Sequence, residues 1–208
     1  KLTYWFSVPS VGMFMNRFKM LRPNSFPSFK VSLFCGEPLP AVVAESWQNA
    51  ASNSIVENIY GPTETTIGIS HYRYNATTPD VNKTLNEIIS IGKIFSSQQY
   101  KIVDEFDKEV MQDEVGELCL AGEQVTSNYL NNIEATKKGF VRFNDSENLW
   151  YKTGDLVVQD SEGDLFFKSR KDFQVKILGH RVELEEINLC IKSIISENTV
   201  ISLPYPVQ

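Results

Sequence analysis

The first third of the chain alternates short apolar runs with longer segments of helical spacing. The apolar runs Leu2–Val8, Val31–Cys35 and Ile55–Ile59 are bounded by Pro, Gly or polar residues, which predicts strands. Between them, Val11–Leu21 and Ala41–Ala51 have the spacing of helices. Runs such as the second strand are typical of parallel sheets that are buried on both faces. This order predicts the edge of a parallel sheet in an α/β fold.

The middle of the chain has a different pattern, in which polar turns such as DEFDKE and DSEGD separate short apolar segments. One short helix is predicted, at Ile133–Lys138. The predicted strands are Ile67–Tyr74, Tyr100–Val103, Glu117–Ala121, Leu156–Gln159 and Leu165–Lys168. Strands without intervening helices predict an antiparallel or barrel-like subdomain.

The end of the chain returns to mixed strand and helix signals. A strand is predicted at Phe173–Leu178, a turn at Gly179 and a last strand at Thr199–Leu203. A helix is predicted between them from apolar residues at helical spacing, namely Leu184, Ile187, Ile191 and Ile194. A unit of this size is too small to bury a core of its own.

Composition narrows the class of protein. The 208 residues are 42% hydrophobic and 22% charged, as in folded globular proteins. The net charge of −6 gives no basic footprint for nucleic acid, although a few local donors can still bind an anion. Cys35, Cys119 and Cys190 are odd in number and far apart, which favours a reducing compartment such as the cytoplasm. No apolar run approaches the roughly 18 residues that predict a membrane span.

The densest group of reactive side chains is NIYGPTETT, residues 58–66. Its Gly-Pro pair argues against a helix, so Tyr60 and Glu64 are expected on a loop at the carboxyl end of a strand, where open α/β sheets bind ligands. The ring of Tyr60 can stack on a flat ligand, and the hydroxyl of Thr63 can donate to a phosphate. The carboxylate of Glu64 can bind Mg²⁺. An ordinary turn with a capping threonine explains the same residues.

Three further segments carry polar groups of interest. In YKTGDLV, Asp155 can accept two hydrogen bonds from the diol of a ribose, although Thr-Gly-Asp is also a common hairpin turn. Arg170 and Arg181 are planar donors suited to phosphate or ribose oxygens, although lone arginines are more often surface residues. In GELCLAGEQVTSNYL, a strand, a Gly turn and a buried Tyr129 indicate a structural segment.

Together these segments are more specific than any one alone. LFCGEPLP, NIYGPTETT, GELCLAG, YKTGD and KDFQVKILGHRVELEEI follow one another as in the adenylate-forming enzymes. The chain resembles the amino-acid adenylation domains of nonribosomal peptide synthetases and, most of all, D-alanine–carrier protein ligases. Such enzymes use Mg-ATP to adenylate an amino acid, release pyrophosphate and pass the acyl group to a carrier-protein phosphopantetheine thiol. The resemblance implies that residues 1–171 are the C-terminal portion of the large AMP-binding domain, and 172–208 the start of the small mobile domain.

The resemblance also implies a role for individual residues. Tyr60 would stack on adenine, Thr63 would touch the α-phosphate, and Glu64 would bind Mg²⁺. Asp155 would hold the ribose hydroxyls, with Arg170 beside them. The implied nucleotide-binding residues are Gly36, Glu37, Pro38, Asn58, Tyr60, Thr63, Asp155, Arg170 and Arg181. The implied catalytic residues are Thr63, Glu64 and Arg170, and the implied hinge is Asp172.

The resemblance places the acyl pocket on the first sheet. The implied lining is Phe6, Leu33, Cys35, Ile59, Ile67 and Gly68. No charged group is among them and Ile59 would fill space, so a small or apolar amino acid is expected. Cys35 matches the cysteine that shapes the alanine pocket of D-alanine ligases, but a small buried hydrophobe explains it equally. Gly68 would leave extra room, so alanine itself stays open.

Departures from the family limit this interpretation. Ser169 stands where the family has Gly, which would stiffen the approach to the hinge, and Ser127-Asn128 replaces an Arg-Gly pair. The phosphate loop is expected before Lys1 and the lysine that orients the acyl carboxylate after Gln208. The chain is therefore expected to be a middle fragment of a longer protein and inactive alone.

Two alternatives to an amino-acid ligase stay open. One is an acyl- or aryl-coenzyme A ligase of the same superfamily, and the other is a non-catalytic remnant of the fold. The ELEEIN and FCGE segments favour the amino-acid ligase. The intact set of nucleotide residues argues against a remnant.

Overall fold

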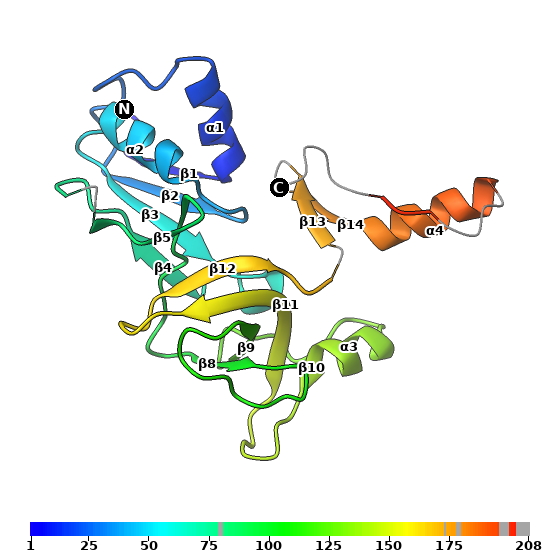
Figure 1. The fold of residues 1–208 in the computed structure, drawn as a ribbon. Coiled ribbons are helices and arrows are strands. Elements are labelled where there is room, and N and C mark those ends of the chain that lie inside the picture. Colours follow the sequence, from blue (N-terminus) through cyan, green and yellow to red (C-terminus); the bar gives the residue numbers. More distant parts are fainter. Residues whose placement is uncertain (79–80, 173, 178–179, 196–199, 203–208) are drawn as a thin grey trace.

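The computed structural model is a mixed α/β fold and describes residues 1–78, 81–172, 174–177, 180–195 and 200–202. In this part of the chain the strands form two five-stranded sheets and two small two-stranded sheets (Figure 1). The first large sheet has the order β1 (Tyr4–Ser7), β2 (Val31–Cys35), β3 (Ile55–Tyr60), β4 (Ser70–Arg73) and β7 (Lys93–Ile94). Because β1, β2 and β3 are parallel and β4 and β7 antiparallel, the predicted parallel edge is confirmed and ends at β3.

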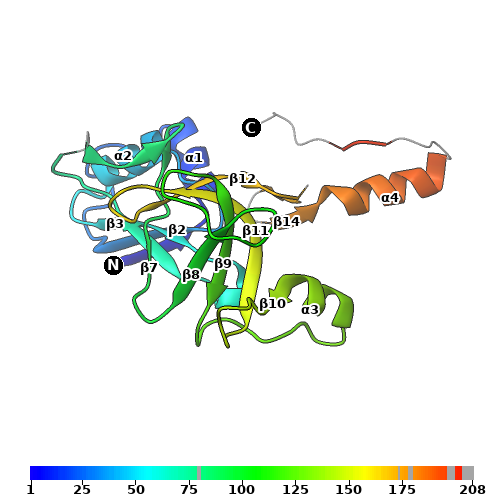
Figure 2. The same cartoon turned by 60° about the horizontal axis from the view of Figure 1, so that its bottom comes forward.

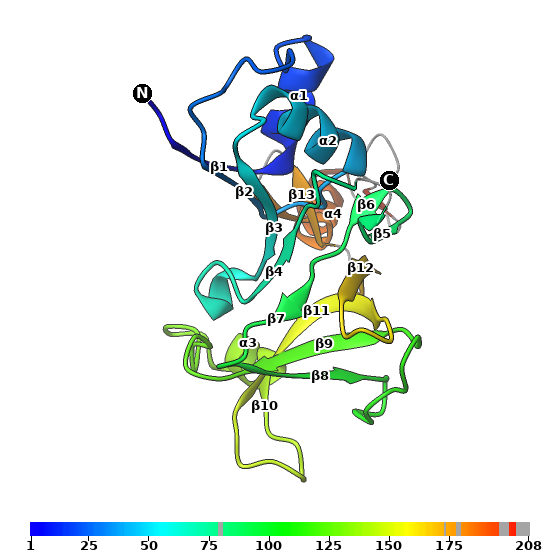
Figure 3. The ribbon, with the colours of Figure 1, turned by 90° about the vertical axis from the view of Figure 1, so that its left-hand side faces the viewer.

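Helices α1 (Pro9–Arg17) and α2 (Ala41–Ala50) lie on one face of this sheet (Figure 3). α2 begins directly after Pro40, close to the predicted bounds. α1 begins two residues earlier than predicted, with a proline in its first turn, and stops before the predicted end at Leu21. It stops because Lys19 has a φ of 55°, which a right-handed helix cannot contain.

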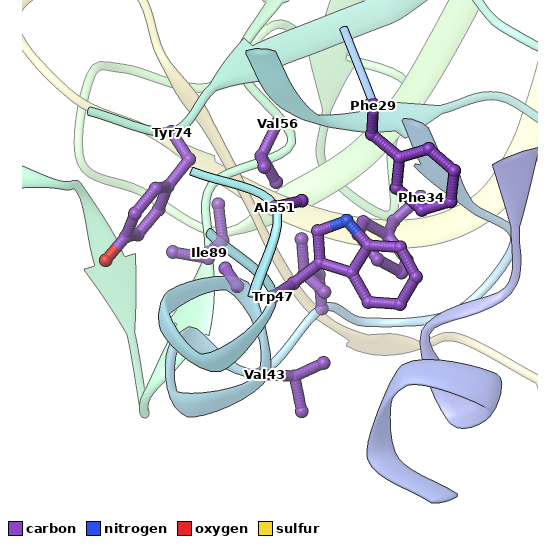
Figure 4. Packing of buried hydrophobic residues seen from close by; sticks show 10 residues of the cluster. Phe29, Phe34, Val43, Trp47, Ala51, Val56, Tyr74 and Ile89 are labelled. Carbon is purple, nitrogen blue, oxygen red and sulfur yellow. The ribbon is translucent and has the colours of Figure 1, made fainter. Parts of the chain in front are cut away.

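The core under these helices is built around Trp47 (Figure 4). Its side chain is fully buried, with ring centroids 4.8 Å from Trp5 and 5.1 Å from Phe34. The rings of Phe26 and Phe29 stack against it from the loop between α1 and β2. Aromatic rings bury large areas and prefer these offset and edge contacts, so they hold α2 on the sheet.

The opposite face of the first sheet is largely exposed. Tyr4 is 69% and Phe6 is 59% exposed, and Ile55 is also exposed. The burial of β1 and β3 alternates along the strand, because no element of the described residues covers the second face. β2, the strand that was expected to be buried on both faces, has no exposed residue, so the exposure on this face is confined to its neighbours β1 and β3.

The second large sheet is antiparallel, as predicted, and lies below the first in Figure 3. It consists of β8 (Gln99–Val103), β9 (Gly116–Ala121), β10 (Phe140–Val141), β11 (Trp150–Gln159) and β12 (Leu165–Arg170). β9 is buried along its whole length. Its residues Leu118 and Leu120 pack with Val157, Leu165 and Ile69, which joins the two sheets through one apolar cluster.

Several elements differ from the sequence predictions. β4 starts three residues later than predicted because Thr66 and Ile67 have positive φ values of 57° and 73°. β11 starts six residues earlier, at Trp150. The predicted short helix forms as α3 (Ile133–Gly139), and Asn132 Oδ1 accepts the Ala135 N–H at its start. The hairpin of β5 (Thr84–Leu85) and β6 (Ile88–Ile89) was not predicted, nor were β7, β10 and β14, most of which have only two residues.

The last part of the chain forms a separate unit that projects to one side of the two sheets (Figures 1 and 2). It contains β13 (Gln174–Ile177), β14 (His180–Glu183) and α4 (Leu184–Ile195), of which β13 and α4 were predicted. Residues 200–202 form no strand, and the N–H of Ser202 donates to Asn188 Oδ1 at 2.6 Å. The predictions for residues 173, 178, 179, 199 and 203 lie outside the described residues.

No helix in the described ranges has the length and apolar character needed to cross a membrane. None of the three cysteines forms a disulfide; Cys35 and Cys119 are buried, and Cys190 is exposed on α4. Burial, with the nearby charge of Glu117, raises the pKa of the Cys119 thiol to about 12. Cys119 therefore stays a neutral thiol at ordinary pH.

We expect a thiol-alkylating reagent at pH 8 to modify Cys190 alone in the native protein. Reagent attack requires a thiolate and access. Cys35 and Cys119 are buried, and the pKa of Cys119 also lies well above the assay pH. Peptide mass spectrometry after a short labelling pulse measures this, and labelling in denaturant is the control in which all three react. Fast native labelling of Cys119 would contradict its placement in β9.

Candidate functional site

Three of the predicted nucleotide residues meet where β3, β11 and β12 end or bend. Tyr60 is the last residue of β3, and its hydroxyl donates to Asp155 Oδ2 at 2.5 Å. Arg170, the last residue of β12, lies opposite Asp155 in the register and donates from Nη1 to its Oδ1 at 2.7 Å. Both carboxylate oxygens of Asp155 are thus engaged by groups from two other strands. The sequence predicted the residues, but not that Tyr60 contacts Asp155.

A bulge in β11 aims Asp155 at this meeting point. The pairing with β9 shifts between Lys152 and Leu156, and Gly154 within the shift has a φ of +71°. A Cβ at Gly154 would lie 2.7 Å from Arg170 Nη2, so only glycine leaves space for the guanidinium. Thr153 Oγ1 accepts the Asp155 N–H at 3.0 Å. The alternative of a hairpin turn is therefore wrong, since one strand runs through the segment.

The charges at this point are coupled through Arg170. It forms a two-point contact with Asp172, from Nε to Oδ1 at 2.9 Å and from Nη2 to Oδ2 at 2.6 Å. Burial lowers the pKa of the guanidinium, but hydrogen bonds to Asp172 and the charge of Asp155 raise it more, so it stays charged. Burial and Asp155 also raise the pKa of Tyr60 well above its usual value, so its hydroxyl remains a donor. One arginine thus links the proposed ribose residue to the proposed hinge.

Glu64 lies in a single 3₁₀ turn, η1 (Thr63–Thr65), directly after Pro62. A loop without a helical turn was predicted, but proline with an extended backbone is tolerated just before a first turn. Glu64 is 5% exposed, and its Oε1 accepts a hydrogen bond from the Tyr129 hydroxyl at 2.5 Å. The side chain of Thr63 is at the surface of the same turn. Tyr129 is half-buried rather than buried as predicted.

The loop before Tyr129 holds this turn from the side. The N–H of Thr126 donates to the carbonyl oxygen of Glu64 at 2.8 Å. Gln124 Nε2 donates to the carbonyl oxygens of Thr65 and Gly68, at 3.3 and 2.8 Å. The segment assigned only a structural role therefore contributes to the site. No local pattern predicts this, since about 60 residues separate the partners.

The donor set around Glu64 suits a magnesium ion that is shared with phosphates. Mg²⁺ prefers hard oxygen ligands and is usually held by one or two carboxylates together with substrate phosphates. Among the residues that the structure describes, no group of three or more His, Cys, Asp or Glu side chains could form a protein-only metal site. One buried carboxylate beside an exposed threonine hydroxyl fits the shared arrangement.

The remaining predicted nucleotide residues have contacts within the protein. Glu37 Oε2 accepts the Ser10 N–H at 2.9 Å in the first turn of α1. Asn58 is 3% exposed and donates to the carbonyl oxygens of Ile89 and Ser90 at 3.3 and 3.0 Å, which ties β3 to β6. Gly36, with a φ of 96°, and Pro38 follow the end of β2. Their contacts with adenine stay predictions, and the side chain of Arg181 lies outside the described part.

The predicted acyl-pocket residues share the uncovered face of the first sheet. Cys35 and Ile59 are neighbours in the register of β2 and β3, as are Phe6 and Leu33 in β1 and β2. Ile67 and Phe6 are exposed, whereas Cys35 is buried.

A Cβ added at Gly68 would lie 2.8 Å from Ile59 Cγ2, so these two residues are in close contact, and the extra room at Gly68 stays a prediction. Two hollows of about 400 and 480 Å³ on the second sheet contain none of the predicted residues and are not this pocket.

Comparisons with known proteins agree with this geometry. Residues 1–130 match the family described as AMP-binding enzyme. The D-alanine–D-alanyl carrier protein ligase of Bacillus velezensis is 34% identical over 207 residues, covering 99% of this chain and 39% of the relative. Nonribosomal peptide synthetase 7 of Aspergillus fumigatus is 37% identical over 174 residues, covering 83% of this chain and 7% of the relative.

A solved structure is also similar. The adenylation domain AlmE of Vibrio cholerae, in complex with glycyl-adenosine-5'-phosphate, has 35% identity and a TM-score of 0.88, covering 100% of this chain and 38% of its own. This chain therefore spans less than two fifths of the length of the ligase and of AlmE. The predicted fold class, including its place in the C-terminal part of an adenylation-domain core, is confirmed.

Proposed function

The chain belongs to the AMP-binding enzyme family, and on that basis we propose that its full-length parent is an ATP-dependent adenylating ligase for a small amino acid. The observation that carries this proposal is the meeting of Tyr60, Asp155 and Arg170, which come from separate strands. A carboxylate held between a phenol and a guanidinium is placed to accept the two hydroxyls of a ribose.

In the proposed reaction, an oxygen of the amino-acid carboxylate attacks the α-phosphorus of ATP. The bond to the bridging oxygen breaks, and pyrophosphate leaves with that electron pair. A phosphopantetheine thiolate of a carrier protein then attacks the acyl carbonyl, and AMP leaves. Thr63 would contact the α-phosphate and Arg170 would balance the charge beside the ribose. Bound Mg²⁺, held by Glu64, would supply neutralisation of the phosphate charge.

Space on the first sheet favours a small substrate. Ile59 fills the position beside Gly68, and no charged side chain is among the proposed pocket residues. The Bacillus relative is named for D-alanine, and AlmE was solved with a glycyl adenylate. We therefore propose D-alanine and glycine as the leading candidates.

The proposed domain boundary lies between Lys171 and Asp172. It is supported by the separate position of β13, β14 and α4, which follow Asp172 and project from the two sheets (Figure 2). Rotation of this unit about Asp172 would serve the two half-reactions, since hinges are a few residues at the ends of elements. Cysteines that form no disulfide suit the cytoplasm as the proposed compartment.

An ATP–pyrophosphate exchange assay on the full-length parent tests the function. With a panel of D- and L-amino acids, we expect glycine or D-alanine to exceed leucine and aspartate by roughly 10-fold or more, because each poorly fitting group in a closed pocket costs about that factor. The isolated 208-residue chain is expected to show almost no exchange, because it spans less than two fifths of the length of the ligase and of AlmE. A reaction without amino acid is the control.

Two outcomes would favour the alternatives. Exchange with fatty or aryl acids, and formation of a coenzyme A thioester, would indicate an acyl-coenzyme A ligase. No exchange with any acid, from a correctly folded parent that still binds AMP, would indicate a non-catalytic remnant. Robust exchange by the isolated chain would contradict the proposal that it is only part of the enzyme.

A further inference from the structure

Glu117 is a buried carboxylate to which the proposed function assigns no role. It lies in β9, is 5% exposed, and faces the bulge of β11. Its Oε1 accepts the N–H of Gly154 at 3.1 Å, and its Oε2 is 3.0 Å from Lys171 Nζ and 3.6 Å from Lys152 Nζ. Burying a carboxylate is unfavourable unless it is paired and hydrogen-bonded, and here both oxygens are engaged.

The contacts of Glu117 compensate for a break in the sheet. Between Lys152 and Leu156 the β9–β11 pairing shifts, and the N–H of Gly154 donates to the Glu117 side chain instead. The carbonyl oxygen of Gly154 accepts the backbone N–H of Lys171 at 2.8 Å. Glu117, Gly154 and Lys171 thus form a closed ring of three contacts, with Asp155 and Asp172 as the next residues along the chain.

We propose that Glu117 is a positioning residue that fixes the Gly154 peptide, and so aims the Asp155 carboxylate at the nucleotide. The ring also ties residue 171 to the bulge that carries Asp155. This inference rests on the proposed role of Asp155 in binding ATP. Since Gly154 has a left-handed backbone and no side chain, hydrogen bonds orient its peptide groups, and the bond to Glu117 is the one that holds the Gly154 N–H.

A purely structural role for Glu117 would have a different effect on the KM for ATP. After removal of Glu117, Lys152 still pairs with Asp107 at 2.5 Å. Lys171 is half-exposed, so water can solvate its charge. If Glu117 only balanced charge, its loss would change stability and leave the affinity for ATP unchanged. If it positions Asp155, the KM for ATP rises while the KM for the amino acid stays the same.

The test compares Glu117→Ala, Glu117→Gln and the control Asp107→Asn in the full-length parent. For Glu117→Ala we expect a rise of about 10-fold in the KM for ATP, with kcat and the amino-acid KM within about 2-fold, because a small displacement of a binding group costs roughly this much. Glu117→Gln keeps an acceptor for the Gly154 N–H, so the KM for ATP should return to within about 3-fold of the wild type. Asp107→Asn removes the carboxylate charge that pairs with Lys152, and it should change neither the KM for ATP nor the KM for the amino acid.

Hydrogen exchange at the Gly154 amide provides a readout that does not need activity. Site-resolved mass spectrometry should show exchange about 10-fold faster or more in Glu117→Ala, and near the wild-type rate in Glu117→Gln, because only the first loses the acceptor. An unchanged Gly154 amide in Glu117→Ala overturns the inference, whether or not the parent is active. A faster amide with an unchanged KM for ATP overturns it as well. A wild-type parent without pyrophosphate exchange would instead refute the proposed function. Hydrogen exchange at the Gly154 amide would then be the only test of the inference.

Discussion

Replacing Asp155 with alanine is expected to raise the KM for ATP of the full-length parent about 100-fold. The carboxylate would make two charge-assisted hydrogen bonds to the ribose, each contributing about 1.5 to 3 kcal/mol, and every 1.4 kcal/mol is about a factor of ten. The substitution also leaves the Tyr60 hydroxyl and one arm of Arg170 without their acceptor. The measurement is ATP–pyrophosphate exchange at varied ATP, with AMP binding by calorimetry as a second readout.

The fold should survive this change with a moderate loss of stability. Asp155 and Arg170 are both largely buried, but Arg170 keeps Asp172 and the Thr153 carbonyl oxygen, so we expect a loss of about 2 kcal/mol in the free energy of unfolding. The matched control is Asp145→Ala, which removes a carboxylate from an exposed ion pair with Lys101 and should leave the KM for ATP unchanged. A folded Asp155→Ala variant with wild-type affinity for ATP would remove Asp155 from the site.

Local sequence patterns predicted the elements whose limits are set by neighbouring residues. β2 has its predicted bounds because an apolar run ends at Gly36, and α2 begins at its predicted residue because Pro40 can only precede or open a helix. The sequence patterns did not predict the ends of helices and strands that are set by an unusual backbone conformation. The positive φ values of Lys19 and of Ile67 end α1 early and delay β4, although neither residue type favours that conformation. Tertiary contacts therefore impose these two limits.

In the candidate site, too, one part could be predicted from local sequence and another part could not. Residue type and order were sufficient to propose Tyr60, Asp155 and Arg170, because the chemistry of each side chain can be read from a single position. The contacts between them could not be predicted, since 95 residues separate Tyr60 from Asp155. The contact of Tyr129 with Glu64 spans 65 residues and has no pattern in either segment. A sequence thus identifies the groups that can bind a nucleotide, and the sheet register determines which of them meet.

The exposure of one face of the first sheet is a further feature that the sequence could not predict. An apolar strand predicts burial on both faces, but it cannot show which part of a protein supplies the second cover. Tyr4 and Phe6 are exposed in a chain that spans less than two fifths of its ligase relative. The proposed acyl pocket lies on this face, so the described residues would supply one side of it, and the inactivity of the isolated chain stays a prediction.

Replacing Glu64 with glutamine is expected to have the second large effect, a fall of about 100-fold or more in the exchange rate of the full-length parent. The amide keeps the shape of the side chain and an acceptor for the Tyr129 hydroxyl, so the turn should stay folded. It loses the negative charge that would hold Mg²⁺ against the phosphates, and the loss of one such electrostatic group typically costs about 100- to 1,000-fold. Exchange measured over a range of Mg²⁺ concentrations should also show half-saturation at a higher concentration.

Tyr129→Phe is the matched variant for this test, because it leaves the carboxylate in place and removes only the hydroxyl that donates to it. A shift in the same direction but of about 5- to 10-fold is expected, since a ligand whose orienting hydrogen bond is lost holds its metal less well. Chelation of Mg²⁺ should stop exchange by the wild type and by both variants. If Glu64→Gln retained the wild-type rate and the wild-type dependence on Mg²⁺, Glu64 would not be a metal ligand, and the buried pair that it forms with Tyr129 would serve only to hold the turn after β3.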